Sequence, residues 1–205
     1  MEIYRIEDYK KTKKLVYLCE DAPAFCLYNK EIKKYDLKEG EDLSDEIYEE
    51  IMEVLKKRAR ERALYLLEDM ARTENQIRKK LREGYYPDEA VDSAIEYCKD
   101  KHYIDDFDFA VQFIESRSGT LSKKMIMQKL YLKGISKELA EEAFEEADVD
   151  ESKAVYDLIV KKYGSLESYQ ELPFEEKNSF IRKLMTRGFG YDAIKAAGEN
   201  QLDII

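Results

Sequence analysis

The chain has 205 residues, 39% of them charged, and a formal net charge of −10 at pH 7. This acidity argues against a simple nucleic-acid-binding protein, and the mean hydropathy of −0.65 argues against one thick globular core. No apolar run approaches the roughly 20 residues that span a bilayer, so no membrane segment is expected. With only 8 glycines and 3 prolines, the composition favours an elongated array of small helical units.

The first 30 residues differ from the rest because they contain short aromatic and apolar runs. Lys14–Cys19 and Ala24–Tyr28 have the pattern of a β-hairpin, and Ile3–Ile6 is a candidate third strand. The register of the hairpin stays open, because the length of the turn is ambiguous. An isolated hairpin is marginal in water, so we expect it to pack on a helical turn near Ile32. We predict a small β region confined to residues before Asn29.

A long helical pattern follows. Ser44 is suited to an N-cap, and from Asp45 apolar residues recur at four-residue intervals. The sequence does not decide between one helix and two helices broken near Lys57. We place a first domain, a β-hairpin plus a helix region, at residues 1–57.

Three later segments end a helical pattern in the same way, with a basic residue, a glycine and a bulky apolar residue. The glycines, Gly84, Gly134 and Gly188, lie 50 and 54 residues apart. Apolar residues stand seven and three positions before each glycine: Ile77 and Leu81, Met127 and Tyr131, Ile181 and Met185. Positions four apart share a helix face, and a glycine just past a helix end readily becomes left-handed. We therefore predict positive φ at all three glycines.

This internal repeat predicts an all-α fold of tandem three-helix repeats, forming an elongated curved solenoid after the N-terminal β-hairpin region. We expect nine repeat helices in three triplets, at residues 58–105, 106–150 and 151–205. The third repeat carries an insertion from Gly164 to Leu172 and ends in a tail from Gly198. The predicted helix starts are two capping boxes, one proline at a first helical position and one proline that reopens a helix: Thr73 with Gln76, Asp148 with Glu151, Pro87 and Pro173.

Nothing in the sequence points to catalysis. Asp105 and Asp106 are adjacent, and neighbouring carboxylates on a helix do not face each other as an acid/base couple must. His102, the one histidine, has no evident nucleophile beside it and is expected at the surface. The three cysteines lack metal-ligand spacing and are expected to be reduced thiols in a cytosolic protein. We expect no enzyme, no cofactor and no metal.

Charge is unevenly distributed along the chain. Between Lys56 and Arg82 there are ten basic and four acidic residues, whereas between Glu138 and Glu151 there are eight acidic residues and no basic one. Basic residues on the second helices recur in all three repeats and predict a stripe able to meet phosphates or an acidic partner surface. The alternative is ordinary solvated charge. The candidate contact residues are Arg78, Lys79, Arg82, Lys123, Lys124, Lys129, Arg182 and Lys183.

One stretch carries a family resemblance. His102–Asp106, followed by Phe109–Ala110 and Phe113, closes a first repeat whose second helix ends with Lys80–Tyr85. In this order and spacing the chain resembles the RecX family, regulators of the bacterial recombinase RecA. Ala24–Gly40 also resembles the additional hairpin region of Firmicutes-type members. The resemblance covers nearly the whole chain.

The resemblance implies a cytoplasmic, mainly inhibitory protein that binds the RecA–DNA filament. Such a protein modulates RecA ATPase and strand exchange, and through them homologous recombination, DNA repair and the SOS response. The implied partner is the RecA filament, with single- or double-stranded DNA inside it as a second contact and no membrane. We expect a monomer. The alternative function is a helical-repeat adaptor that binds another protein.

Overall fold

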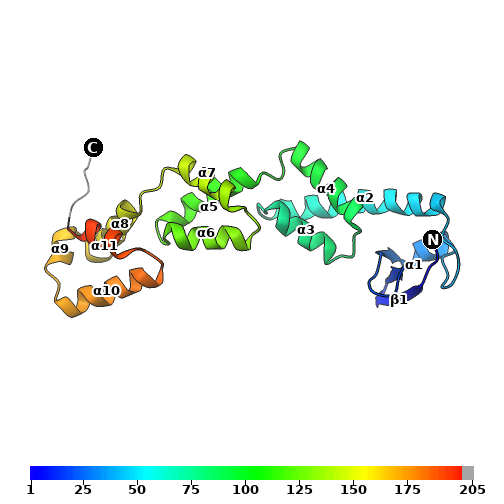
Figure 1. Cartoon of the computed structure of the whole chain (residues 1–205), viewed down its shortest axis with the longest axis horizontal. Coiled ribbons are helices and arrows are strands. Elements are labelled where there is room, and N and C mark those ends of the chain that lie inside the picture. The colour runs from blue at the N-terminus through cyan, green and yellow to red at the C-terminus, as the bar shows by residue number, and fades with distance from the viewer. Residues whose placement is uncertain (200–205) are drawn as a thin grey trace. The chain divides into compact units, whose positions relative to one another are not determined.

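The computed structural model describes residues 1–199 and divides into two compact units, Met1–Asp105 and Asp106–Ile205 (Figure 1). The first unit contains a three-stranded sheet of β1 (Arg5–Lys10), β2 (Lys13–Tyr17) and β3 (Phe25–Tyr28). Its helices are α1 (Asn29–Lys34), α2 (Asp45–Glu68), α3 (Glu74–Arg82) and α4 (Asp88–Asp100). The second unit contains α5 (Asp106–Ser118), α6 (Lys123–Leu132), α7 (Lys137–Ala147), α8 (Glu151–Tyr163), α9 (Leu166–Gln170), α10 (Phe174–Thr186) and α11 (Tyr191–Gly198).

The sheet confirms the predicted β region before Asn29. Its order is β1-β2-β3, both pairs are antiparallel, and Val16 faces Phe25 across β2 and β3. The strand predicted at Ile3–Ile6 is β1, and it begins at Arg5 rather than at Ile3. The reason is that the backbone of Ile3 bonds instead to the loop after α1, donating to the Glu41 carbonyl at 3.0 Å.

Helix α2 is continuous across Lys57. Ser44 caps it as predicted, its hydroxyl oxygen accepting from the Ile47 amide at 3.3 Å. The apolar stripe of α2 is buried in a single core that also contains Phe25 and Leu27 of the sheet and Ile77 of α3. The β region and the first repeat therefore share one core, and the boundary placed after residue 57 falls inside a helix.

The predicted three-helix repeats are confirmed as α2–α3–α4, α5–α6–α7 and α8–α10–α11. The insertion in the third repeat forms the short helix α9. Leu166 and Tyr169 of α9 are buried in the core of the third repeat. Residues 200–205 of the predicted tail lie outside the described residues.

The predicted helix starts are confirmed only in part. Thr73 and Gln76 form the expected capping box, with reciprocal bonds of 3.3 and 3.2 Å. The prediction of Asp148 as a cap is wrong: it is left-handed with φ 45° and ends α7, while Asp150 caps α8 by accepting from the Ser152 amide at 2.7 Å. Pro87 occupies the N-cap rather than the first helical position of α4. A helix reopens at Pro173 as predicted, with Pro173 as the N-cap of α10.

The second helices of the repeats end in a common turn that is built around a buried leucine. The leucines Leu81, Leu130 and Leu184 are each 0% exposed. Four positions later the backbone is left-handed, with φ 59° at Tyr85, 88° at Gly134 and 88° at Gly188. The next amide then donates to the leucine carbonyl at 3.4, 3.1 and 3.3 Å respectively, as in a Schellman turn. Positive φ is thus confirmed at two glycines and wrong at Gly84, where Tyr85 takes that position.

The same turn corrects the buried positions of the later repeats. Ile77 and Leu81 are buried as predicted, but Tyr131 is 74% and Met185 is 52% exposed. When the repeats are aligned on their glycines, Tyr131 and Met185 fall opposite Leu81, one position after the buried leucines that are its true equivalents. The reason is that the glycine of the first repeat follows its buried leucine by three positions, whereas those of the other repeats follow theirs by four. The fully or nearly fully buried pairs are Ile126 with Leu130 and Phe180 with Leu184.

Candidate binding surface

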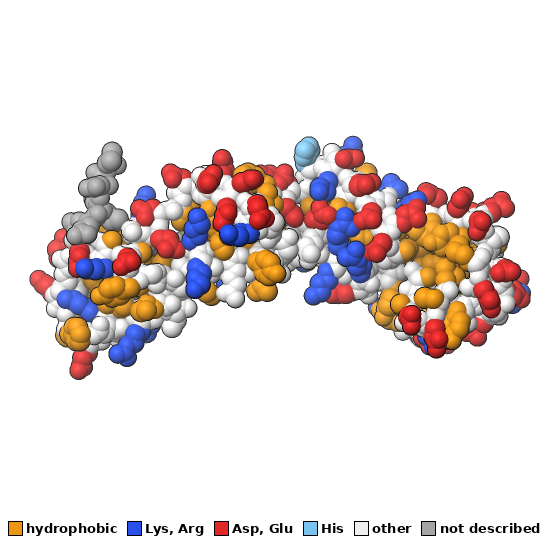
Figure 2. Space-filling view, viewed as in Figure 1, with side chains coloured by type: hydrophobic (Ala, Val, Ile, Leu, Met, Phe, Trp, Pro, Cys, Tyr) orange, Lys and Arg blue, Asp and Glu red, His pale blue; other side chains and the backbone are white. Residues whose placement is uncertain are grey.

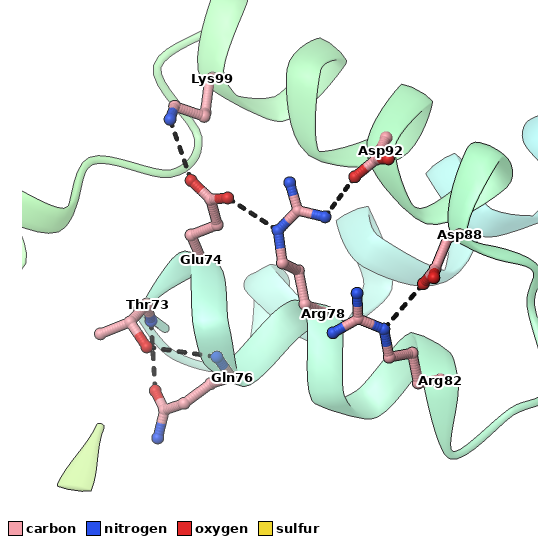
Figure 3. Close-up of polar contacts among 8 residues, drawn as sticks. All are labelled: Thr73, Glu74, Gln76, Arg78, Arg82, Asp88, Asp92 and Lys99. Atoms are coloured by element: carbon pink, nitrogen blue, oxygen red, sulfur yellow. Dashed lines mark hydrogen bonds and ion pairs between the residues drawn. The ribbon is translucent and has the colours of Figure 1, made fainter. Parts of the chain in front are cut away.

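Helix α3 carries Arg78, Lys79 and Arg82, and Figure 3 shows that both arginines point toward α4. Nε of Arg78 donates to Glu74 at 2.7 Å, and its Nη1 donates to Asp92 of α4. Nε of Arg82 donates to Asp88 at 2.9 Å. These two guanidinium groups hold α3 against α4. Lys79 is exposed and forms no ion pair with any described residue.

The α3–α4 network stays ionised because its groups neutralise one another. Burial by itself would raise the pKa of Glu74, but hydrogen bonds from Lys99, at 2.9 Å, and from Arg78 outweigh it and lower that pKa. Burial opposes the charge of Arg78, but the bonds to Asp92 and Glu74 outweigh it and raise the pKa of its guanidinium. Arg78 therefore offers little free charge to a partner.

Helix α6 carries Lys123, Lys124 and Lys129. Its N-cap, Ser122, is 1% exposed and accepts from the Met125 amide at 3.3 Å. The backbone amide of Lys123 donates to the carboxylate of Glu151, and its ammonium lies 4.9 Å from the centre of the Phe144 ring. Lys124 and Lys129 are exposed and make no ion pair within residues 1–199.

Helix α10 carries Arg182 and Lys183, both exposed and without an ion pair in the described part of the chain. Lys183 lines a pocket of about 440 Å³ in the third repeat. Lys129 of α6 lines a pocket of about 480 Å³ in the second repeat. The predicted basic residues are thus spread over three helices, and two of them lie at pockets that the sequence did not indicate.

The buried leucines show which basic residues truly occupy equivalent positions. Lys79 and Arg182 both stand two positions before the leucine. One position before it stand Lys80, Lys129 and Lys183. The prediction misses Lys80 because the glycine alignment shifts the register by one, and aligning on a leucine preceded four residues earlier by another apolar residue would find it. It also misses five pocket cations, three of them on the first helices and two directly before the glycines, because the predicted stripe is confined to the second helices. The missed pocket cations are Arg117, Lys133, Lys161, Lys162 and Arg187.

Acidic and basic side chains gather over different helices. Figure 2 shows Lys and Arg side chains over α3 and Asp and Glu side chains over α7. The acidic run predicted between Glu138 and Glu151 is exposed along α7 at positions 138, 141, 142, 145 and 146. The uneven charge of the sequence is thus an uneven charge of the surface.

The one histidine lies at the surface, and two of the cysteines lie in the core. His102 is exposed, as predicted, with φ 54°. Cys26 and Cys98 are buried free thiols, and burial raises the pKa of both. Within residues 1–199, no group of three or more His, Cys, Asp or Glu side chains is placed to hold a metal ion. No helix there is both long and apolar enough to cross a membrane.

Known proteins match this chain in sequence and in fold. The sequence profile described as "RecX, first three-helix domain" matches residues 59–98, and that described as "RecX, second three-helix domain" matches residues 105–143. The regulatory protein RecX of Clostridium botulinum (strain Eklund 17B / Type B) is 30% identical over 202 residues, covering 95% of this chain and 93% of the relative. That of Finegoldia magna is 29% identical over 201 residues, covering 95% and 97%.

Two solved structures share the fold of this chain. A crystal structure of regulatory protein RecX superposes with a TM-score of 0.58 at 23% identity, covering 97% of this chain and 98% of the other. The structure of RecX from Lactobacillus salivarius gives a TM-score of 0.58 at 24% identity, covering 74% and 98%. Both show the same fold. Since a relative at 30% identity is matched along nearly its whole length, this chain belongs to the RecX family.

Proposed function

We propose that this protein binds the RecA–DNA filament and restrains it, slowing filament growth, ATP hydrolysis and strand exchange. The observation that most supports this proposal is that proteins named regulatory protein RecX align with 95% of this chain. We infer that it acts in the cytoplasm, where the recombinase works, and that it acts by binding rather than by chemistry. Its effect is a binding free energy that favours an inactive filament.

The cations on the second helices support a charged docking surface. Lys79, Lys124 and Arg182 are exposed, belong to three different repeats and make no ion pair with a described carboxylate. A cation that is not already neutralised can exchange water and counterions for phosphates or carboxylates of a partner. Arg78 and Arg82 are poorer probes, because changing either would also weaken the α3–α4 contact.

The test measures DNA-dependent ATP hydrolysis and strand exchange by the cognate RecA with increasing amounts of this protein. Wild-type protein should inhibit both at or below an equimolar ratio and hydrolyse no ATP alone. The triple charge reversal Lys79→Glu, Lys124→Glu and Arg182→Glu should weaken inhibition. Added salt should weaken inhibition by the wild type as well, because the Debye length shrinks below about 10 Å above 0.1 M salt.

A single-site control tests whether reversing the charge of any exposed lysine weakens inhibition. Lys137 lies on the acidic helix α7, and its side chain is 74% exposed. Lys137→Glu should leave inhibition unchanged. Full inhibition by the folded triple variant would remove these residues from the interface. If wild-type protein has no effect on its own RecA, the family function does not hold here, and an adaptor for another protein becomes the better account.

A further inference from the structure

The second repeat contains a cationic pocket between its first two helices. The pocket holds about 480 Å³ and is lined by Phe113 and Arg117 of α5, Lys129 and Leu132 of α6, and Lys133 just after α6. The guanidinium of Arg117 lies 5.8 Å and the ammonium of Lys133 5.3 Å from the centre of the Phe113 ring. This aromatic face therefore holds two cations at the pocket wall.

The third repeat contains a second pocket of the same kind. It holds about 440 Å³, and its cations are Lys161 and Lys162 of α8, Lys183 of α10 and Arg187 just after α10. The ammonium of Lys162 lies 4.5 Å from the centre of the Phe180 ring. Among the described residues, neither pocket has an aspartate or glutamate in its lining.

The two pockets share a set of equivalent residues, although Thr120 of the second repeat also lines the pocket of the third. Lys129 and Lys183 each precede the buried leucine of their helix, and Lys133 and Arg187 each precede the left-handed glycine. Arg117 and Lys162 each stand three residues after a buried isoleucine of the first helix, Ile114 or Ile159. Phe113 and Leu158 each precede that isoleucine and line the pocket wall.

The first repeat lacks this set of residues. Lys80 stands where Lys129 and Lys183 stand, but it is paired with Glu83 at 2.7 Å. The position of Lys133 and Arg187 is occupied by Gly84, which has no charge to offer. Lys80 is therefore a matched control within the same chain for the two pocket lysines.

Helix dipoles alone do not account for so many cations. The C-terminal ends of two helices supply about half a negative charge each, which attracts a cation but is outnumbered by three or four of them. Lys129, Lys183 and Arg187 are not neutralised by any carboxylate among the described residues. The exposed cations of each pocket can therefore bind an anion from outside.

We propose that the pockets of the second and third repeats are two equivalent phosphate-binding sites that hold successive stretches of one nucleic-acid strand. A pair of like sites built on repeated helices suits a polymer whose charged group also repeats. Lysine and arginine converging on one hollow suit backbone phosphates, which carry no sequence information. Two linked sites on one strand bind more tightly than either alone, because the second event is intramolecular. This deepens the proposed function and rests on it for where the strand is met.

The test measures binding of a fluorescein-labelled oligo(dT) strand to the full-length protein by anisotropy, without RecA. Lys129→Glu and Lys183→Glu should each weaken binding on the order of tenfold, and the double variant more than either. The slope of log K against log salt, which is negative, should become less steep by about 0.7 for each phosphate that a variant no longer binds. Lys80→Glu, with the same change of charge, should bind like wild type.

Three outcomes would overturn the assignment. One is that the pocket variants, folded by circular dichroism, bind no more weakly than Lys80→Glu. Another is that poly-L-glutamate displaces the strand as well as unlabelled oligo(dT) does at equal charge, which would mean that the pockets take carboxylates of a protein. A wild-type protein that inhibits RecA but binds no oligonucleotide would remove the phosphate sites and leave the proposed function standing.

Discussion

Gly188 lies at a close contact between the third repeat and the second. A Cβ atom at Gly188 would lie 2.5 Å from both Met125 Cγ and Ser122 Oγ. Beside it, the amide of Ser122 donates to the carbonyl of Arg187 at 3.2 Å. Glycine is required here twice, once for its φ of 88° and once for the space that it leaves.

Gly164 allows these two requirements to be separated. It has the same φ of 88°, but a Cβ atom added there would have no neighbouring atom within 4 Å. Gly164→Ala should cost at least about 1–2 kcal/mol from the backbone alone, because φ 88° with ψ −39° lies outside the regions that residues with a Cβ atom readily adopt. Gly188→Ala should cost about 1–3 kcal/mol more, because the methyl group overpacks the contact with α6. Urea unfolding of both variants measures the difference, and equal destabilisation would show that the contact yields freely.

Tyr85 is a tyrosine in a left-handed position that other repeats give to glycine. Its φ is 59°, and its ring packs edge-on against Tyr9 with centroids 5.0 Å apart. Tyr85→Gly should relieve about 1 kcal/mol of backbone strain but remove an aromatic pair and its buried surface, together worth more. We expect a net destabilisation in urea unfolding. In a Tyr9→Ala background the same change should become neutral or stabilising; destabilisation of the same size in both backgrounds would contradict the role given to the ring pair.

At the scale of elements, α3 and α4 are joined by ion pairs whose arginines the sequence predicts to face a partner. Arg78→Ala should lower the free energy of unfolding by about 1–2 kcal/mol, because it removes the bonds from the Arg78 guanidinium to Glu74 and Asp92. Lys79→Ala, on the same helix, should change it by under about 0.5 kcal/mol. Equal effects of the two substitutions in urea unfolding would show that the ion pairs of Arg78 contribute nothing.

The cost of Arg78→Ala should depend on pH. The pKa of Glu74 lies below its ordinary value of 4.5 in the folded protein, so its ionised form stabilises the fold above that value. That contribution disappears as the pH falls through the lowered pKa. The difference between wild type and Arg78→Ala should therefore shrink in acid and be constant near neutrality, as unfolding at a series of pH values can check.

The sequence predicts elements better than their register. Helix starts with a side-chain cap, such as Ser44 and Thr73, are predicted correctly because the capping bond is local. The turn at Tyr85 is not, because a bulky left-handed residue is stabilised by packing on β1, which no local pattern reveals. That one error shifts the alignment of repeats, and with it the equivalence of the basic residues. The α4 partners of Arg78 and Arg82, Asp92 and Asp88, also escape prediction, because α4 is a separate element.

At the scale of the whole molecule, the repeats of the two units differ in what they pack against. The first repeat shares a core with the β-sheet inside Met1–Asp105. In the second unit, α6 begins with two amides bonded to the third repeat: that of Ser122 to the Arg187 carbonyl and that of Lys123 to the Glu151 carboxylate. The second and third repeats therefore support one another.

Expression of fragments tests this dependence. Residues 1–105 should fold alone and give a dispersed amide NMR spectrum, because their core is complete. Residues 106–150 should be less stable than 106–199, since the shorter fragment lacks the acceptors for the start of α6. Equal thermal stability of the two fragments would show that the contact between the second and third repeats is dispensable.

The close contact at Gly188 also bears on how relatives of this protein vary. A side chain at position 188 and a long side chain at position 125 compete for the same space. Position 122 must keep a small hydroxyl residue that both caps α6 and clears the glycine. Mutations at these three positions should therefore be tolerated only in certain combinations. Across an alignment, residues 125 and 188 should change together, although 63 positions separate them, while position 122 keeps a small hydroxyl residue.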